Sequence, residues 1–354
     1  NPIWGAGASL AKYRTAAGLL AAPAAALAQG RDAVLATGSS TVAPFTRAVA
    51  DALAEGRQGP RAEVRSVGTV WGFSEFCQGL GPRYADIQDA SRRITLAEMT
   101  QCASRGVHEL LELPIGHDGI VVAHRRGLPP LDLTREELWR GLAREVPGPG
   151  GRLVANPHRT WRDVSARLPD WPIRVIGPPA TSGTRDSFGD LALLPGCLVV
   201  PEVAAMPDAP ARRRLCLALR EDGGWVDGGE DDEAIVRQVR DGAPGTLGVF
   251  GFSFLEAHRA EIAAATIEGV ADSRETIASG RYPLARPLYL YAKRQHIEMF
   301  PFVAAFLDEY VSDRAMGPDG YLVRAGLVPP DTAGLERLRR IVRERAVMTR
   351  RPER

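Results

Sequence analysis

Residues 173–188 have the sequence IRVIGPPATSGTRDSF. The apolar run 173–176 predicts a short buried strand, and Pro178 and Pro179 end it because proline lacks the N–H that a strand ladder uses. From residue 188 the apolar side chains return with a pattern compatible with a helix. The Ser-Gly-Thr-Arg segment in this stretch therefore lies where a strand gives way to a helix.

This segment has the chemistry of an anion site. The start of a helix has unpaired backbone N–H groups and a partial positive charge. Ser182 and Thr184 add two hydroxyls, and Gly183 lets the backbone approach a ligand closely. Arg185 can hold a tetrahedral oxyanion through two parallel hydrogen bonds. The alternative is an ordinary helix cap by Ser182 or Thr184, followed by an arginine on the surface.

Length and composition describe a globular protein with two lobes. The chain has 354 residues, which is long for a single core, and 45% of them are apolar and 25% charged. Lys and Arg number 44 against 43 Asp and Glu, so the net charge is only +1. This balance gives no overall field for nucleic acid, and an anion must be bound by local groups.

The N-terminal residues have the layout of a secretory signal peptide. Lys12 and Arg14 precede an apolar run over 15–27, and Ala26-Leu27-Ala28 is a small-x-small cleavage pattern. The run is short for a membrane span. We therefore expect a signal peptide over 1–28 and a periplasmic protein, with an Ala-rich structural helix or an uncleaved anchor as alternatives.

The four cysteines are then expected to form two disulfides, because an exported protein folds in an oxidising compartment. Cys77, Cys102, Cys197 and Cys216 include no C-x-x-C pair, and no histidine follows at zinc spacing. Three pairings are possible. The local one, Cys77–Cys102 with Cys197–Cys216, needs the least rearrangement, and four buried free thiols are the alternative.

Strand and helix patterns alternate along the chain, which indicates an α/β fold with largely parallel pairing. A hydroxyl-rich turn at 38–42 again joins a strand to a helix. The apolar runs 108–114 and 119–123 predict one long interrupted strand that crosses between lobes, and 288–291 predicts the return crossing.

Six motifs occur together in an order that resembles one family. They are GSSTV with a following PF at 38–45, DASRRI at 89–94, DGIV at 118–121, GPPATSGTRDSF at 177–188, GVFGFSF at 248–254 and YPLARPLY at 282–289. From about residue 34 to 328 the chain resembles the periplasmic phosphate-binding protein of bacterial ABC importers, in the subgroup that carries Gly-Ser-Ser-Thr-Val.

The resemblance implies a type II periplasmic binding protein, in which two α/β lobes are joined by two crossing strands and the ligand lies between them. Lobe one would comprise 30–117 plus 290–354, and lobe two 118–289. It also implies a monomer when free, which needs no cofactor and hands inorganic phosphate to the membrane subunits of an importer.

Carried over by position, the resemblance implicates a set of phosphate-binding residues from both lobes. They are Ser39, Ser40, Thr41, Ser91, Arg92, Ser182, Gly183, Thr184 and Arg185. Each of them supplies a hydrogen-bond donor. Many family members have an aspartate where this chain has Arg92, and that aspartate accepts the proton of hydrogen phosphate. Asp118 is our candidate for this role, with a hinge salt bridge as the alternative.

Two further departures concern the rest of the pocket. An arginine often found four residues before Ser182 is Pro178 here, so Arg185 becomes the main cation of its loop. A turn that is usually glycine-rich contains Val70 and Trp71, whose side chains could narrow or fill the pocket.

Three classes of function follow. The first is a phosphate-binding protein of an importer, and the second is an enzyme such as a phosphatase or serine hydrolase. The sequence has six histidines, no Gly-x-Ser-x-Gly motif and no metal-spaced cluster, which argues against the enzyme. Ser187 and His117 are the only pair that could be nominated. The third class is a repurposed homologue with weak or absent phosphate binding, acting as a structural or signalling subunit.

Overall fold

The computed structural model describes residues 31–55, 59, 61–229 and 231–349. Its elements all belong to one compact unit, Asp32–Arg354. The signal peptide predicted over 1–28 lies outside the described residues. In the part of the chain that is described, no helix is both long enough and apolar enough to cross a membrane.

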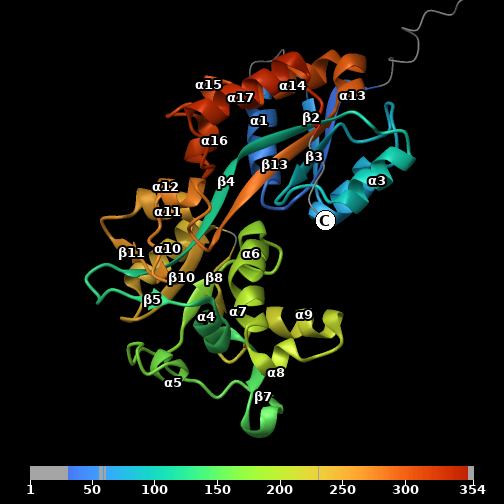
Figure 1. The fold of residues 1–354 in the computed structure, drawn as a ribbon. Helices are drawn as coiled ribbons and strands as arrows, with labels where there is room; N and C mark the ends of the chain where they lie inside the picture. Colours follow the sequence, from blue (N-terminus) through green and yellow to red (C-terminus); the bar gives the residue numbers. More distant parts are fainter. Residues whose placement is uncertain (1–30, 56–58, 60, 230, 350–354) are drawn as a thin grey trace, which may run out of the picture. The chain divides into compact units, whose positions relative to one another are not determined.

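Strands and helices alternate over most of the chain (Figure 1). The strands are β1 (Ala33–Gly38), β2 (Arg61–Ser66), β3 (Ile87–Ala90), β4 (Leu110–Arg125), β5 (Asp132–Leu133), β6 (Glu145–Pro147), β7 (Leu153–Ala155), β8 (Val175–Gly177), β9 (Trp225–Asp227), β10 (Leu247–Gly251), β11 (Ile262–Ala264), β12 (Thr266–Ile267) and β13 (Ala285–Lys293). The helices before β8 are α1 (Ala43–Glu55), α2 (Thr69–Phe76), α3 (Leu96–Ser104), α4 (Arg135–Leu142), the 3₁₀ turn η2 (Pro149–Gly151) and α5 (Trp161–Val164).

The later helices are shorter on average and begin with a continuous helical stretch after β8. They are α6 (Gly183–Phe188), the π-helical turn η3 (Gly189–Leu193), α7 (Leu194–Leu198), α8 (Pro201–Ala204), α9 (Ala209–Leu217), α10 (Asp232–Asp241), α11 (Phe252–Ala257), α12 (Arg274–Ala278), α13 (Arg294–Met299), α14 (Pro301–Tyr310), α15 (Asp313–Met316), α16 (Tyr321–Arg324) and α17 (Thr332–Glu344). The strand-to-helix transition predicted around Ser-Gly-Thr-Arg is therefore present, and the helix begins at Gly183, earlier than the apolar pattern from residue 188 indicated.

The main sheet is mixed rather than largely parallel. Its strand order is β2-β1-β3-β13-β4-β10-β8-β9, with β11 also paired to β4. The pairs β1/β2, β1/β3, β8/β10 and β8/β9 are parallel, whereas every pair made by β4 or β13 is antiparallel. The prediction of largely parallel pairing is wrong for these two strands. They join the same two halves of the sheet in opposite directions, so they must be antiparallel.

β4 and β13 run side by side through the middle of the molecule (Figure 1). β4 is continuous over 16 residues, which confirms the single interrupted strand predicted over 108–123. The interruption is a register shift between Leu288 and Tyr289 of β13. Gly116 lies there with φ of +142°, and a Cβ on it would come within 2.4 Å of the Val328 carbonyl oxygen. Only glycine fits this close approach.

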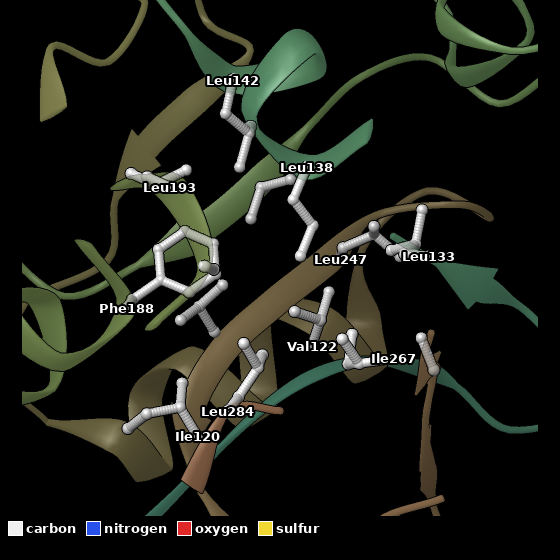
Figure 2. Close-up of a cluster of buried hydrophobic side chains, with 14 of the residues drawn as sticks. Ile120, Val122, Leu133, Leu138, Leu142, Phe188, Leu193, Leu247, Ile267 and Leu284 are labelled. Carbon is white, nitrogen blue, oxygen red and sulfur yellow. The ribbon is translucent and has the colours of Figure 1, made fainter. Parts of the chain in front are cut away.

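Buried apolar side chains gather in separate clusters on the two halves of the sheet. The largest cluster is built from residues between Ile120 and Leu284, joined by Val328. A second is built from residues within 34–115 and 288–342, and a third, smaller one lies around Phe73. Figure 2 shows Phe188, the last residue of α6, inserted among the side chains of the first cluster. This anchors the short helix that carries Arg185.

Both predicted disulfides are confirmed. Cys77 pairs with Cys102, which joins the end of α2 to α3, and Cys197 pairs with Cys216, which joins α7 to α9. Each bridge therefore closes a local loop within one region of the fold.

Candidate functional site

The candidate site is a cleft of about 890 Å³ where the turns after β1 and β3 meet α6 and the start of β13. We call it the main cleft. Its lining residues are Ser39, Ser40, Thr41, Gly68, Thr69, Val70, Ser91, Arg92, Arg93, Ala180, Arg185, Asp186, Gly189, Asp190, Leu191, Leu193, Arg213, Leu217, Ala285, Arg286, Pro287 and Tyr289. Its five arginines outnumber its two aspartates, Asp186 and Asp190, so the lining carries an excess of positive charge, as an anion site needs.

The turn after β1 is held by a backbone hydrogen bond to β3. The Ser39 N–H donates to the Asp89 carbonyl at 2.9 Å. Gly38 has φ of +130°, and a Cβ there would lie 2.1 Å from the same carbonyl oxygen, so the turn requires glycine. The Ser39 hydroxyl accepts from the Thr41 N–H at 3.2 Å. These contacts aim the Ser40 and Thr41 side chains away from the sheet, toward α6.

The start of α6 touches this turn directly. The Thr41 hydroxyl donates to the Gly183 carbonyl at 3.3 Å, and a Cβ on Gly183 would lie 2.6 Å from the Ser40 carbonyl oxygen. The Ser182 hydroxyl accepts from the Thr184 N–H at 3.2 Å and so acts as the helix cap. The helix-cap interpretation therefore holds for Ser182, and Gly183 serves the close approach of two backbones.

This contact divides the predicted site residues between two cavities. Ser91, Arg92 and Arg185 line the main cleft, together with Ser39. A second hollow of about 360 Å³, which we call the side cavity, is lined by Asp118 and by Ser182, Gly183 and Thr184. Ser40 and Thr41 line both. One small ligand cannot reach both sets of donors while Gly183 stays against Ser40.

Ser91 and Arg92 are engaged by neighbouring side chains. The Ser91 and Thr69 hydroxyls lie 3.1 Å apart, and the Ser91 N–H donates to the Thr69 hydroxyl at 3.2 Å. Arg92 donates through both terminal nitrogens to Glu98, at 3.0 and 2.7 Å. Its positive charge is thus already paired with a carboxylate, which weakens it as a candidate ligand of an anion.

Arg286 is the residue that our reasoning from the sequence missed. It lies on β13, is only 8% exposed, and donates from Nη2 to the Thr41 hydroxyl at 2.5 Å and to the Ser187 hydroxyl. Its ion-pair partner in the described structure is Asp190, whose Oδ2 lies 3.8 Å from the Arg286 Nη1. Its Nε is buried without a hydrogen-bond partner in the described structure. The YPLARPLY motif contained this arginine, but nothing in its spacing indicated burial.

Asp118 lies directly opposite Arg286 in the β4/β13 register. Burial raises the pKa of this carboxyl above its ordinary value, while the nearby Arg286 charge and hydrogen bonds from Gly119 and Ser187 lower it. The net direction is upward. Asp118 therefore holds a proton more readily than a carboxyl in water, and it accepts a hydrogen bond from a protonated anion only in its ionised form.

Arg185 is held by an aromatic ring instead of an acid. Its guanidinium lies 4.6 Å from the centroid of the Trp225 ring. It makes no hydrogen bond or ion pair with any residue that the structure describes. Burial lowers the pKa of Arg185, against the attraction of Asp186 and Asp227, but an arginine remains charged. Its N–H donors are therefore available to a ligand.

Val70 and Trp71 do not fill the cleft. Their side chains are 66% and 70% exposed, and only Val70 is among the lining residues. The expectation that both could occupy the pocket is therefore wrong for Trp71. The reason is that α2 begins at Thr69, which places Trp71 in its first turn on the exposed side.

The pair nominated for an enzyme is not assembled. The Ser187 hydroxyl donates to the Gly183 carbonyl at 2.9 Å and contacts Thr41 and Arg286, whereas the His117 Nδ1 has no partner in the described structure. No group of three His, Cys, Asp or Glu side chains suited to a metal occurs among the described residues. Among the described residues, Ser187 is therefore hydrogen-bonded within the contact between α6 and the turn after β1 and is not paired with His117.

Two comparisons at the level of sequence relate this chain to known proteins. A family model described as "PBP superfamily domain" matches residues 23–314. Protein SphX of Synechocystis sp. is 32% identical over 301 residues, which cover 83% of this chain and 79% of SphX. The phosphate-binding protein PstS of Staphylococcus epidermidis is 25% identical over 292 residues, which cover 80% of this chain and 77% of PstS.

Solved structures agree on the fold. A possible phosphate binding protein from Planctomyces limnophilus matches with a TM-score of 0.69 at 24% identity, covering 88% of this chain and 98% of that one. An ABC-type phosphate transport receptor from Vibrio cholerae matches with a TM-score of 0.55 at 21% identity, covering 84% and 100%. At these identities the likeness confirms the predicted α/β periplasmic-binding-protein fold, here with a mixed sheet.

Proposed function

The chain belongs to the periplasmic-binding-protein superfamily, whose members bind solutes and are not enzymes, and on that premise we propose that it captures inorganic phosphate and delivers it to an ABC importer. Relatives named for phosphate binding support the choice of ligand. The Gly-Ser-Ser-Thr-Val subgroup, the periplasmic location after removal of residues 1–28, and the monomeric state belong to the same proposal. So does the division into lobes 30–117 plus 290–354 and 118–289, which the separate hydrophobic clusters support.

The observation that carries the proposal is the setting of Arg286. Arg286 is 8% exposed, its Nε has no partner in the described structure, and its hydrogen-bond partners are hydroxyls instead of a carboxylate. The guanidinium therefore retains much of the free-energy cost of its desolvation. A tetrahedral oxyanion would supply both the missing acceptor and the missing charge. The Thr41 and Ser187 hydroxyls already accept hydrogen bonds from Arg286, so a ligand oxygen bound beside them could contact a hydroxyl and the guanidinium together.

Two of the other predicted residues, Arg185 and Asp118, fit around this centre. Arg185 adds a second cation from α6. Asp118 offers a carboxylate that can accept a hydrogen bond from the protonated oxygen of the ligand. For one phosphate to contact residues of both the main cleft and the side cavity, the Gly183 backbone must separate from Ser40. We therefore propose that binding is coupled to a movement of α6 relative to the turn after β1.

One observation also favours the alternative, a repurposed homologue. Thr41, Gly183, Ser187 and Arg286 satisfy one another's hydrogen bonds in part, as a structural contact between the two halves would. In that case the protein would bind phosphate weakly or not at all.

Titration calorimetry with phosphate, and with sulfate as the competing anion, tests the proposal. We expect wild type to bind phosphate, and Arg286→Met to weaken binding at least thirtyfold, in line with the ~2 kcal/mol or more lost when one partner of a buried charge pair is removed. Arg125→Met, at the end of β4 and outside both cavities, is the control and should bind like wild type. Absence of phosphate binding by folded wild-type protein at millimolar ligand would instead establish the repurposed homologue.

A further inference from the structure

We propose that Trp225 is a positioning residue for the anion: its indole ring sets the place and plane of the Arg185 guanidinium so that the N–H edge faces the main cleft. The inference rests on the proposed function. It assigns a role in binding to a residue outside the motifs and outside the lining of either cavity.

The ring itself is held rigidly. Trp225 is the first residue of β9, which pairs in parallel with β8, and its indole lies over Gly177 at the end of that strand. A Cβ on Gly177 would lie 2.1 Å from the ring, so a glycine is required for the indole to occupy this place. Phe188 stacks against the same indole, with ring centroids 5.9 Å apart and an interplanar angle of 19°. The indole thus has little freedom to move.

Arg185 differs from the other arginines of the main cleft. Arg92 is paired with Glu98, Arg93 with Glu112 at 2.8 Å, and Arg213 with Asp190 at 2.8 Å. Arg286 donates to two hydroxyls. Arg185 alone among these five has no hydrogen bond or ion pair with a described residue, and it contacts an aromatic face instead. The proposed role of Trp225 accounts for this aromatic partner in place of a carboxylate.

An aromatic partner leaves the N–H donors of an arginine free, whereas a carboxylate accepts hydrogen bonds from them. The ring attracts the cation through its π face, while the N–H groups lie in the guanidinium plane and point outward from its edge. A ligand oxyanion therefore does not have to displace an internal carboxylate. Because the long side chain is already ordered, less conformational entropy is lost on binding.

The test is calorimetric titration with inorganic phosphate on the full chain. We expect Trp225→Leu to raise the Kd about tenfold, and Trp225→Phe, which keeps a π face, to recover most of that loss. Trp171→Leu is the matched control, because Trp171 is another partly buried tryptophan packed on the same core cluster and outside both cavities. It should leave the Kd within twofold of wild type.

A double-mutant cycle separates positioning from general loosening of the fold. In an Arg185→Ala background, Trp225→Leu should change the Kd by less than twofold, because the group that it positions is gone. If Trp225→Leu weakens binding by the same factor in both backgrounds, the effect is structural and the inference is overturned. If wild type binds phosphate and Trp225→Leu binds as tightly, the inference falls while the proposed function stands. If wild type does not bind, both fall.

A second measurement does not depend on the Trp225 variants folding. In a proton–nitrogen spectrum of arginine side chains of the wild-type protein, the Arg185 Nε–Hε signal should be shifted upfield by the ring current. The signal is assigned by its loss in Arg185→Lys. An Arg185 signal at the position of a solvent-exposed arginine would overturn the inference.

Discussion

Replacing Asp89 with asparagine should change how the stability of this protein depends on pH. Asp89 lies on β3 under the turn that presents Ser39 and is fully buried. The Thr46 hydroxyl donates to its Oδ1 at 2.8 Å, and its Oδ2 has no partner in the described structure. Burial raises the pKa of Asp89 to about 7, although Thr46 and the charge of Arg47 oppose this.

The sign follows from proton binding in the two states. Well below pH 4 the carboxyl is protonated in both the folded and the unfolded chain. Between pH 4 and 7 the unfolded chain releases the proton while the folded protein keeps it, so the free energy of unfolding decreases as pH rises. With a shift from 3.8 to about 7, the loss totals roughly 4 kcal/mol, at about 1.4 kcal/mol for each pKa unit. Above pH 7 the difference stays constant.

Urea denaturation of the oxidised protein at intervals from pH 4 to pH 8 measures this effect. Because asparagine cannot ionise, the difference in unfolding free energy between Asp89→Asn and wild type should grow by several kcal/mol in favour of the variant across the range. Asp51→Asn, which removes an exposed carboxyl from α1, should not reproduce that slope. A difference that stays flat from pH 4 to 8 would show that Asp89 is ionised in the folded protein and refute the reasoning.

Three further predictions follow from the site and the disulfides. Arg185→Ala should weaken phosphate binding by at least ~2 kcal/mol, about thirtyfold, with Arg185→Lys recovering only part; equal affinity in the alanine variant and in the control Arg125→Ala would exclude Arg185 from the site. Asp118→Asn should relax discrimination between phosphate and sulfate, because sulfate has no proton to donate to a carboxylate at neutral pH; an unchanged affinity ratio removes Asp118 from this role. Replacing both Cys77 and Cys102 with alanine should lower the free energy of unfolding by about 3 kcal/mol, and an unchanged urea midpoint would contradict this.

Much of the fold was predictable because its signals are local. Apolar runs bounded by glycine and proline gave the strands, and the hydroxyl-rich turns after β1 and β8 gave the start of α1 and α6. The direction of the crossing strands is a non-local property, since it depends on how the chain returns from one half of the sheet to the other. That is why the prediction of largely parallel pairing was wrong at β4 and β13.

The candidate site was only partly predictable for a related reason. Ser39–Thr41 were proposed from the family resemblance and Arg185 from its turn, but Arg286 lies in a strand between an alanine and a proline, where no periodicity marks it as buried. Likewise, the Thr95-x-x-Glu98 pattern is a capping box, and its glutamate also engages Arg92. A pattern within one helix does not reveal that second partner. Sequence showed which donors exist, and structure showed which of them are already occupied.

The placement of the two disulfides has a mechanical consequence. Cys77 and Cys102 both precede β4, and Cys197 and Cys216 both lie between β4 and β13, so neither covalent bridge spans the pair of crossing strands. Oxidation therefore constrains each half of the sheet separately, and bending between the halves is restrained only by noncovalent contacts and by the backbone of β4 and β13. A reductant would soften the halves without releasing any restraint on their relative motion.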